Sequence, residues 1–113
     1  MLIEQTILDY LTSNGVAACL EIPERGVTPP CCVIERTGGG ETDHIREATV
    51  VIQSYGGTLY LAAQLNELVR ELMEDIIALP SIAACDLNSD YNFTDTTKKQ
   101  YRYQAVYSLV YYG

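Results

Sequence analysis

Hydrophobic side chains recur every three or four residues near the start of the chain, which is the spacing of one face of an α-helix. In residues 2–14 this stripe consists of Ile3, Ile7 and Leu11. The pair Asn14-Gly15 follows, and both residue types readily adopt the left-handed backbone conformation that ends helices. We therefore predict an amphipathic helix over residues 2–14.

A longer stretch, residues 59–79, repeats the same pattern. Gly56-Gly57 precedes it, Thr58 is suited to cap its first turn, and Pro80 marks its end. Acidic and basic side chains fill the side opposite the apolar positions. At 1.5 Å per residue the predicted helix is about 30 Å long, enough to cross a whole sheet. Its apolar stripe consists of Leu61, Leu65, Leu68, Leu72 and Ile76.

Five further stretches have the short apolar or alternating patterns typical of β-strands. They are residues 16–22, 31–36, 45–55, 81–87 and 100–112. The order is helix, three strands, helix, two strands, and strands grouped in this way with two helices favour an α+β fold. We predict a single domain, residues 1–113, with a largely antiparallel sheet of about five strands and both helices packed on one face.

The segment between the second and third predicted strands, residues 37–43, has the sequence TGGGETD. Three consecutive glycines and the polar residues after them make it the most flexible stretch of the chain. Because it lies between two strands, we interpret it as the tip of a hairpin.

The composition of the chain argues against two classes of partner, nucleic acids and membranes. The 113 residues include seven basic and fifteen acidic side chains, which give a formal net charge of −8. This acid excess repels phosphate, so we expect no contact with nucleic acid. No apolar run approaches the ~18–20 residues that span a bilayer, and the first residues lack the basic start of a signal peptide. We therefore expect no membrane partner.

The chain contains four cysteines: Cys19, Cys31, Cys32 and Cys85. A chain of this size with a full complement of apolar residues does not need disulfide bonds for stability. Neighbouring side chains in a strand point to opposite faces, so Cys31 and Cys32 cannot easily share a partner. We predict buried free thiols in a reducing cytoplasm.

Candidate catalytic and metal-binding groups are few. The only histidine, His44, has Glu41 and Asp43 near it, but a flexible tip is not a preorganised metal site. The glycine triplet lacks the Lys-Ser/Thr of a phosphate loop. Gly56-Gly57 precedes a predicted helix start that suits an anion, yet no basic residue lies close in sequence. We therefore predict no cofactor, no metal and no enzymatic activity.

Tyrosine dominates the aromatic residues, with nine Tyr, one Phe and no Trp. Five of the nine lie between Tyr101 and Tyr112, where large side chains with polar tips suit a surface that is buried in a complex. The alternative is that one face of this strand packs beneath the helices. That alternative accounts for Tyr107 more readily than for Tyr111 and Tyr112.

Charge is distributed unevenly along the chain. Residues 91–113 carry Lys98, Lys99 and Arg102 against Asp95 alone, whereas the other residues carry four basic and fourteen acidic side chains. A basic edge and an acidic body allow head-to-tail association, which closes a ring when it repeats around a rotation axis. A random arrangement of surface charge is the alternative.

Several local sequences occur in a familiar order: CCVIER at residues 31–36, the glycine triplet, ATVVIQSY at residues 48–55 and YRYQAVY at residues 101–107. Together with the two amphipathic helices, they resemble the small tail terminator and head–tail joining proteins of long-tailed bacteriophages and prophages. The elements that match this plan cover nearly the whole chain, and none of them is a catalytic signature.

The resemblance implies a structural virion protein with an α+β fold. Proteins of this kind form a hexameric ring that ends the tail tube and joins it to the neck of the head. The implied partners are other copies of the chain, the tail tube protein and a head-completion or neck protein. The implied location is the bacterial cytoplasm during assembly, followed by the tail–neck junction of the virion.

The same plan places a long hairpin loop, of a kind that contacts neighbouring subunits, at residues 37–45. Two alternatives stay open: another head–tail connector or minor capsid component, and a small ligand-binding or enzymatic domain. The candidate subunit-interface residues are Gly38, Gly39, Gly40, Glu41, Asp43, His44, Lys98, Lys99, Arg102, Tyr111 and Tyr112.

Overall fold

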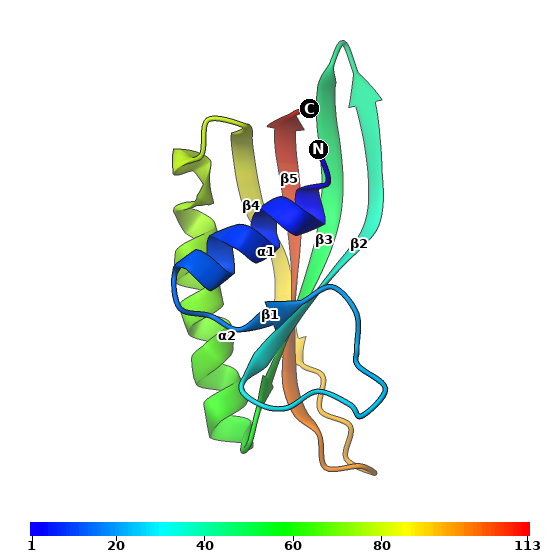
Figure 1. The fold of residues 1–113 in the computed structure, drawn as a ribbon, viewed down its shortest axis with the longest axis vertical. Coiled ribbons are helices and arrows are strands. Elements are labelled where there is room, and N and C mark those ends of the chain that lie inside the picture. Colours follow the sequence, from blue (N-terminus) through cyan, green and yellow to red (C-terminus); the bar gives the residue numbers. More distant parts are fainter.

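A twisted five-stranded sheet runs along the molecule in the computed structural model, which describes all residues from 1 to 113 (Figure 1). The strand order is β1-β2-β3-β5-β4, and all neighbours are antiparallel except β1, which is parallel to β2. The predicted α+β fold and element order are therefore confirmed. The strands are β1 (Ala18–Cys19), β2 (Cys31–Thr42), β3 (Ile45–Gly56), β4 (Ile82–Asn92) and β5 (Tyr101–Tyr112).

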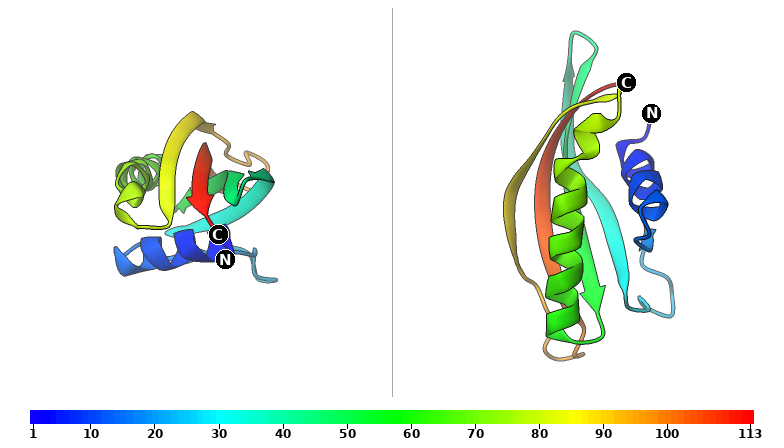
Figure 2. Two further views of the ribbon diagram at one scale, coloured as in Figure 1. Left: turned by 90° about the horizontal axis from the view of Figure 1, so that it is seen from above. Right: turned by 90° about the vertical axis from the view of Figure 1, so that its left-hand side faces the viewer.

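Both helices pack on one face of the sheet (Figure 2). Helix α1 (Ile3–Ser13) lies against β1 and β2, and helix α2 (Leu59–Glu74) lies against β3, β5 and β4. A short 3-10 helix, η1 (Ile76–Ala78), follows α2 and contacts β4. No helix of the structure has the length and apolar character needed to cross a membrane.

Helix α1 follows its sequence pattern closely. Ile3, Ile7 and Leu11 are buried, and the helix ends where Gly15 adopts a φ of 84°. The amide of Gly15 donates to the carbonyl oxygen of Thr12, so the αL glycine satisfies a helix-end carbonyl as expected.

The core fills the space between this helix layer and one face of the sheet. Strand β3 contributes every second residue, and β5 contributes its alternate positions in the same way. The opposite face of the sheet has no helix over it (Figure 2). The buried core residues of β3 and β5 are Ala48, Val50, Ile52, Ala105, Tyr107, Leu109 and Tyr111.

The expected boundaries of several strands were wrong. The first strand is only two residues long, not the seven of residues 16–22, and β4 continues to Asn92 instead of ending at Leu87. The most informative error concerns residues 37–43, which we interpreted as the flexible tip of a hairpin: the hairpin is present, but its turn is only Asp43-His44. Strand β2 in fact continues through the glycines to Thr42 and stays paired with β3.

The glycine triplet is in the strand because β3 holds it there. The register shifts between Arg36 and Gly38, and pairing then resumes between Gly38 and Thr49. A Cβ at Gly39 would lie 2.7 Å from the Glu47 carbonyl oxygen, so a larger residue does not fit at this position. The strands are joined by the two-residue turn Asp43-His44, with φ of 51° and 68°, which is typical of a type I′ hairpin.

Helix α2 differs from prediction in length and in orientation. It ends at Glu74, not at residue 79. Its buried face is centred on Ala62, Asn66, Val69 and Met73. The predicted stripe is only partly inward: Ile76 is in the core and Leu65 and Leu72 pack against it, whereas Leu61 and Leu68 are exposed.

Two observations account for this rotation of α2. A Cβ on Gly56 would lie 2.2 Å from the Ala62 amide nitrogen, so the helix approaches β3 too closely for a leucine at that contact. On the other side, the Asn66 amide donates to the Asp90 carboxylate at 3.3 Å, and Arg70 contacts the same carboxylate at 3.0 Å. These polar contacts tie the helix to β4 and fix which side faces inward.

Candidate subunit interfaces

The predicted interface residues lie at two opposite ends of an elongated molecule, whose extents are 45 × 23 × 22 Å. The β2–β3 hairpin projects at one end, beside both chain termini, and the β4–β5 connection lies at the other (Figure 1). These residues therefore do not form one site. They define two separate surfaces.

At the hairpin end, Glu41, Asp43 and His44 are exposed. The turn end of the hairpin is held by Arg46, whose guanidinium carbon lies 5.3 Å from the centre of the Tyr111 ring. The Arg46 side chain also donates to the carbonyl oxygen of Met1 at 3.2 Å. No three His, Cys, Asp or Glu side chains gather anywhere in the chain to hold a metal ion.

The last strand divides its tyrosines between the core and the surface. Tyr111 is fully buried, so its assignment to a subunit interface is wrong, and Tyr107 is buried beside it in the core. Burial is the main cause that raises the pKa of Tyr107 above its ordinary value. Tyr112 is 55% exposed and pairs with Ile45, the first residue after the hairpin turn, so it stays a candidate contact.

At the opposite end, Arg102 holds its own chain together. Its guanidinium donates to the Tyr55 hydroxyl and to the Phe93 carbonyl oxygen, both at 2.8 Å, and lies 4.7 Å from the centre of the Phe93 ring. Lys98 and Lys99, by contrast, are exposed and form no ion pair. The lysines are therefore the free positive charges of this end.

All four cysteines are free thiols, as predicted. Cys32 is buried, and the other three are half-buried. Desolvation is the largest cause that raises the pKa of Cys32 to about 12 and the pKa values of Cys31 and Cys85 to about 11. These thiols are protonated near neutral pH and are weak nucleophiles in that form.

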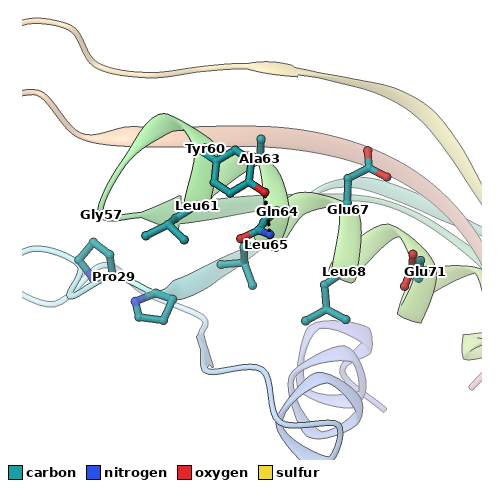
Figure 3. A pocket seen from close by; sticks show the side chains of 11 residues that line it. Pro29, Gly57, Tyr60, Leu61, Ala63, Gln64, Leu65, Glu67, Leu68 and Glu71 are labelled. Carbon is teal, nitrogen blue, oxygen red and sulfur yellow. Dashed lines mark hydrogen bonds between the residues drawn. The ribbon is translucent and has the colours of Figure 1, made fainter.

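The sequence analysis missed an apolar groove on the outer side of α2. The groove has a volume of about 790 Å³, and its floor includes Leu61, Leu65 and Leu68. Pro29 and Pro30 also line the groove, and Figure 3 shows Leu61 on the side of α2 that faces Pro29. A signal for it was present, because Ala62, Asn66, Val69 and Met73 form a second stripe with helical spacing beside the leucines.

The structure thus defines the chain as an α+β protein with one open sheet face, two candidate contact surfaces at its ends and an apolar groove on α2. The sequence matches no protein-family model, and it matches no curated protein. Function is therefore inferred from the surfaces of the molecule itself.

Proposed function

We propose that this protein is a structural subunit of a long-tailed phage or prophage virion. Its copies form a ring that ends the tail tube and joins it to the neck of the head. The support is the resemblance of its local sequences to the tail terminator and head–tail joining proteins, together with the surfaces described above.

The observation that carries the proposal is the projecting β2–β3 hairpin. Its tip extends past the body of the molecule (Figures 1 and 2), and every residue from Gly39 to Ile45 is exposed. This exposed tip, residues 39–45, adds nothing to the core of its own chain but offers contact area to a neighbour. The family plan places a subunit-contacting loop in this part of the chain, which fits the hairpin's position.

Negative-stain electron microscopy of the purified full-length protein tests the proposal. We expect rings of about six subunits, the number that the resemblance implies. Particles that remain single subunits at every protein concentration would contradict a self-assembling ring. A chain that is single in isolation but binds a purified neck protein would instead be another head–tail connector component.

A further inference from the structure

The α2 groove contains Leu61, Leu65 and Leu68, with Tyr60 at one end. Leu65 is half-buried against the core, but the other three side chains are largely exposed in the monomer. Leu61 is 48% exposed, Leu68 is 43% exposed and Tyr60 is 70% exposed. Meanwhile Ala62 and the polar Asn66 occupy the buried side of the same helix. Exposed apolar side chains that gather in one groove, and are not scattered singly, are typical of a contact surface.

Helix α1 covers only part of the outer side of α2. The Tyr10 hydroxyl donates to the Leu72 carbonyl oxygen at 2.6 Å, and Leu72 itself is half-buried. Leu68 points toward α1, whereas Leu61 and Leu65 lie beyond it (Figure 3). The part of the groove along the first two turns of α2 is therefore not covered by α1.

The charge around the groove is negative. Its lining includes Glu67 and Glu71 and contains no Lys or Arg. Glu67 pairs with Arg70 at 3.1 Å but stays 65% exposed, and Glu71 forms no ion pair. A segment that combines an apolar anchor with positive charge is the complement of this surface.

The chain itself carries such a segment in the β4–β5 connection. Lys98 and Lys99 are exposed and unpaired there. Phe93, at the start of the connection, is an exposed apolar ring that contacts the exposed Tyr91 edge-to-face at 5.9 Å. Four of the other five basic residues are already engaged within the chain: Arg36, Arg46, Arg70 and Arg102.

The two complementary surfaces lie at the same end of the molecule. Lys99 lies beside Pro29 and Gly57 at a second hollow, and these two residues also line the groove. In Figure 1 the β4–β5 connection lies on the far side of the molecule from α2 at this end. A head-to-tail contact closes a ring when its rotation closes and it makes no step along the axis. Two surfaces at the same height along the molecule meet the second requirement.

We propose that the β4–β5 connection of one copy docks in the α2 groove of the next copy. The Phe93 ring of the connection covers the leucine floor, and Lys98 and Lys99 meet Glu67 and Glu71. This inference rests on the proposed ring, because it names the contact that closes it.

Charge variants of full-length protein test the docking through the assembly constant, measured by sedimentation velocity. Glu71→Lys weakens assembly at least about tenfold, because two like charges then meet at the contact. Glu74→Lys, on the same helix but outside the groove, makes the same change in net charge and leaves assembly at least as strong as in the wild type. Net repulsion alone predicts that both variants assemble better, so the pair separates the two effects.

Charge-reversal variants of the two lysines, alone and combined with Glu71→Lys, test whether the β4–β5 connection is the segment that docks. Lys98→Glu or Lys99→Glu weakens assembly alone, and at least one of them restores it when combined with Glu71→Lys, at the wild-type net charge of −8. Leu68→Gln removes apolar contact and weakens assembly about tenfold, whereas Ile77→Gln, also exposed but outside the groove, does not.

Each outcome has a distinct meaning. Rings that form equally well with Glu71→Lys and Leu68→Gln would overturn the docking and leave the proposed function standing. A small oligomer that depends on the groove but forms no ring would support the docking and overturn the proposed function. A wild-type chain that stays monomeric at all concentrations would overturn both.

Discussion

Gly56 sets the distance between α2 and β3. A Cβ at this position would lie 2.2 Å from the Ala62 nitrogen and 2.7 Å from the Leu61 carbonyl carbon, both backbone atoms that cannot turn away. We expect Gly56→Ala to lower the free energy of unfolding by about 2–3 kcal/mol, because the helix must shift away from the strand. Urea denaturation measures the change.

The neighbouring glycine provides the control for that substitution. A Cβ on Gly57 would meet nothing within 4 Å, and its φ lies outside the positive range. Gly57→Ala is therefore neutral or stabilising by up to about 1 kcal/mol, through the lower entropy of the unfolded chain. Equal effects of the two substitutions would show that α2 does not approach β3 as closely as described.

Cys32 makes stability depend on pH in the alkaline range. Burial raises the pKa of its thiol from 9.0 to about 12 in the folded protein. Between these values the unfolded chain loses the proton and the folded chain keeps it. The contribution of this thiol to the free energy of unfolding is therefore fully present below pH 9 and is lost as the pH rises toward 12. This thiol alone contributes a slope of about 1.4 kcal/mol per pH unit.

Urea denaturation between pH 8 and pH 10.5 checks this slope. The variant Cys32→Ala is less stable at every pH because it leaves a cavity, but its stability falls less steeply than that of the wild type. Parallel curves for the two proteins would contradict the assigned burial of the thiol.

At the residue scale, the sequence predicts which side chains share a face of a helix or strand more reliably than it predicts what those side chains contact. Alternation in β5 predicts that Tyr107 and Tyr111 share a face, but it does not say that the helices cover that face. The contacts of Arg102 were also not predictable, because the hydrogen bond to Tyr55 joins parts of the chain that are far apart in sequence and the one to Phe93 crosses to another strand end. The groove on α2 was missed for the same reason.

At the scale of elements, the hairpin turn offers a direct test. Asp43 and His44 both have positive φ, a conformation that costs energy for residues with a side chain. We expect the double variant Asp43→Asn/His44→Gly to raise the free energy of unfolding by about 0.5–1 kcal/mol, because Asn-Gly is the preferred type I′ pair. Thermal or urea denaturation measures the gain.

A proline at the second turn position gives the opposite result. Proline fixes φ near −65°, so His44→Pro cannot adopt the observed φ of 68° and destabilises the hairpin. A double variant that is less stable than the wild type, or a proline variant without effect, would contradict a type I′ turn at these residues.

The elements themselves were largely predictable, because each depends on a local pattern. Periodicity located both helices and the long strands, and Gly15 ended α1 where expected. The orientation of α2 was not predictable in this way. It depends on a close contact with Gly56 and on the Asp90 carboxylate of another strand, whereas periodicity alone favoured the larger leucines as the buried side.

At the scale of the whole molecule, assembly depends on a balance between long-range repulsion and local contact. Each copy carries −8, so copies repel one another at low ionic strength. Salt screens this repulsion over distances beyond about 8–10 Å, whereas it leaves the apolar groove unaffected and weakens close ion pairs less. We therefore expect assembly to strengthen from low to moderate salt.

The most direct test of a self-assembling ring is the mass of the purified wild-type protein by light scattering, across low to moderate salt and over a wide range of protein concentration. The account predicts a rise from the mass of a single 12.5 kDa chain toward that of about six chains as salt and concentration increase. A chain that remains monomeric under every one of these conditions would contradict it.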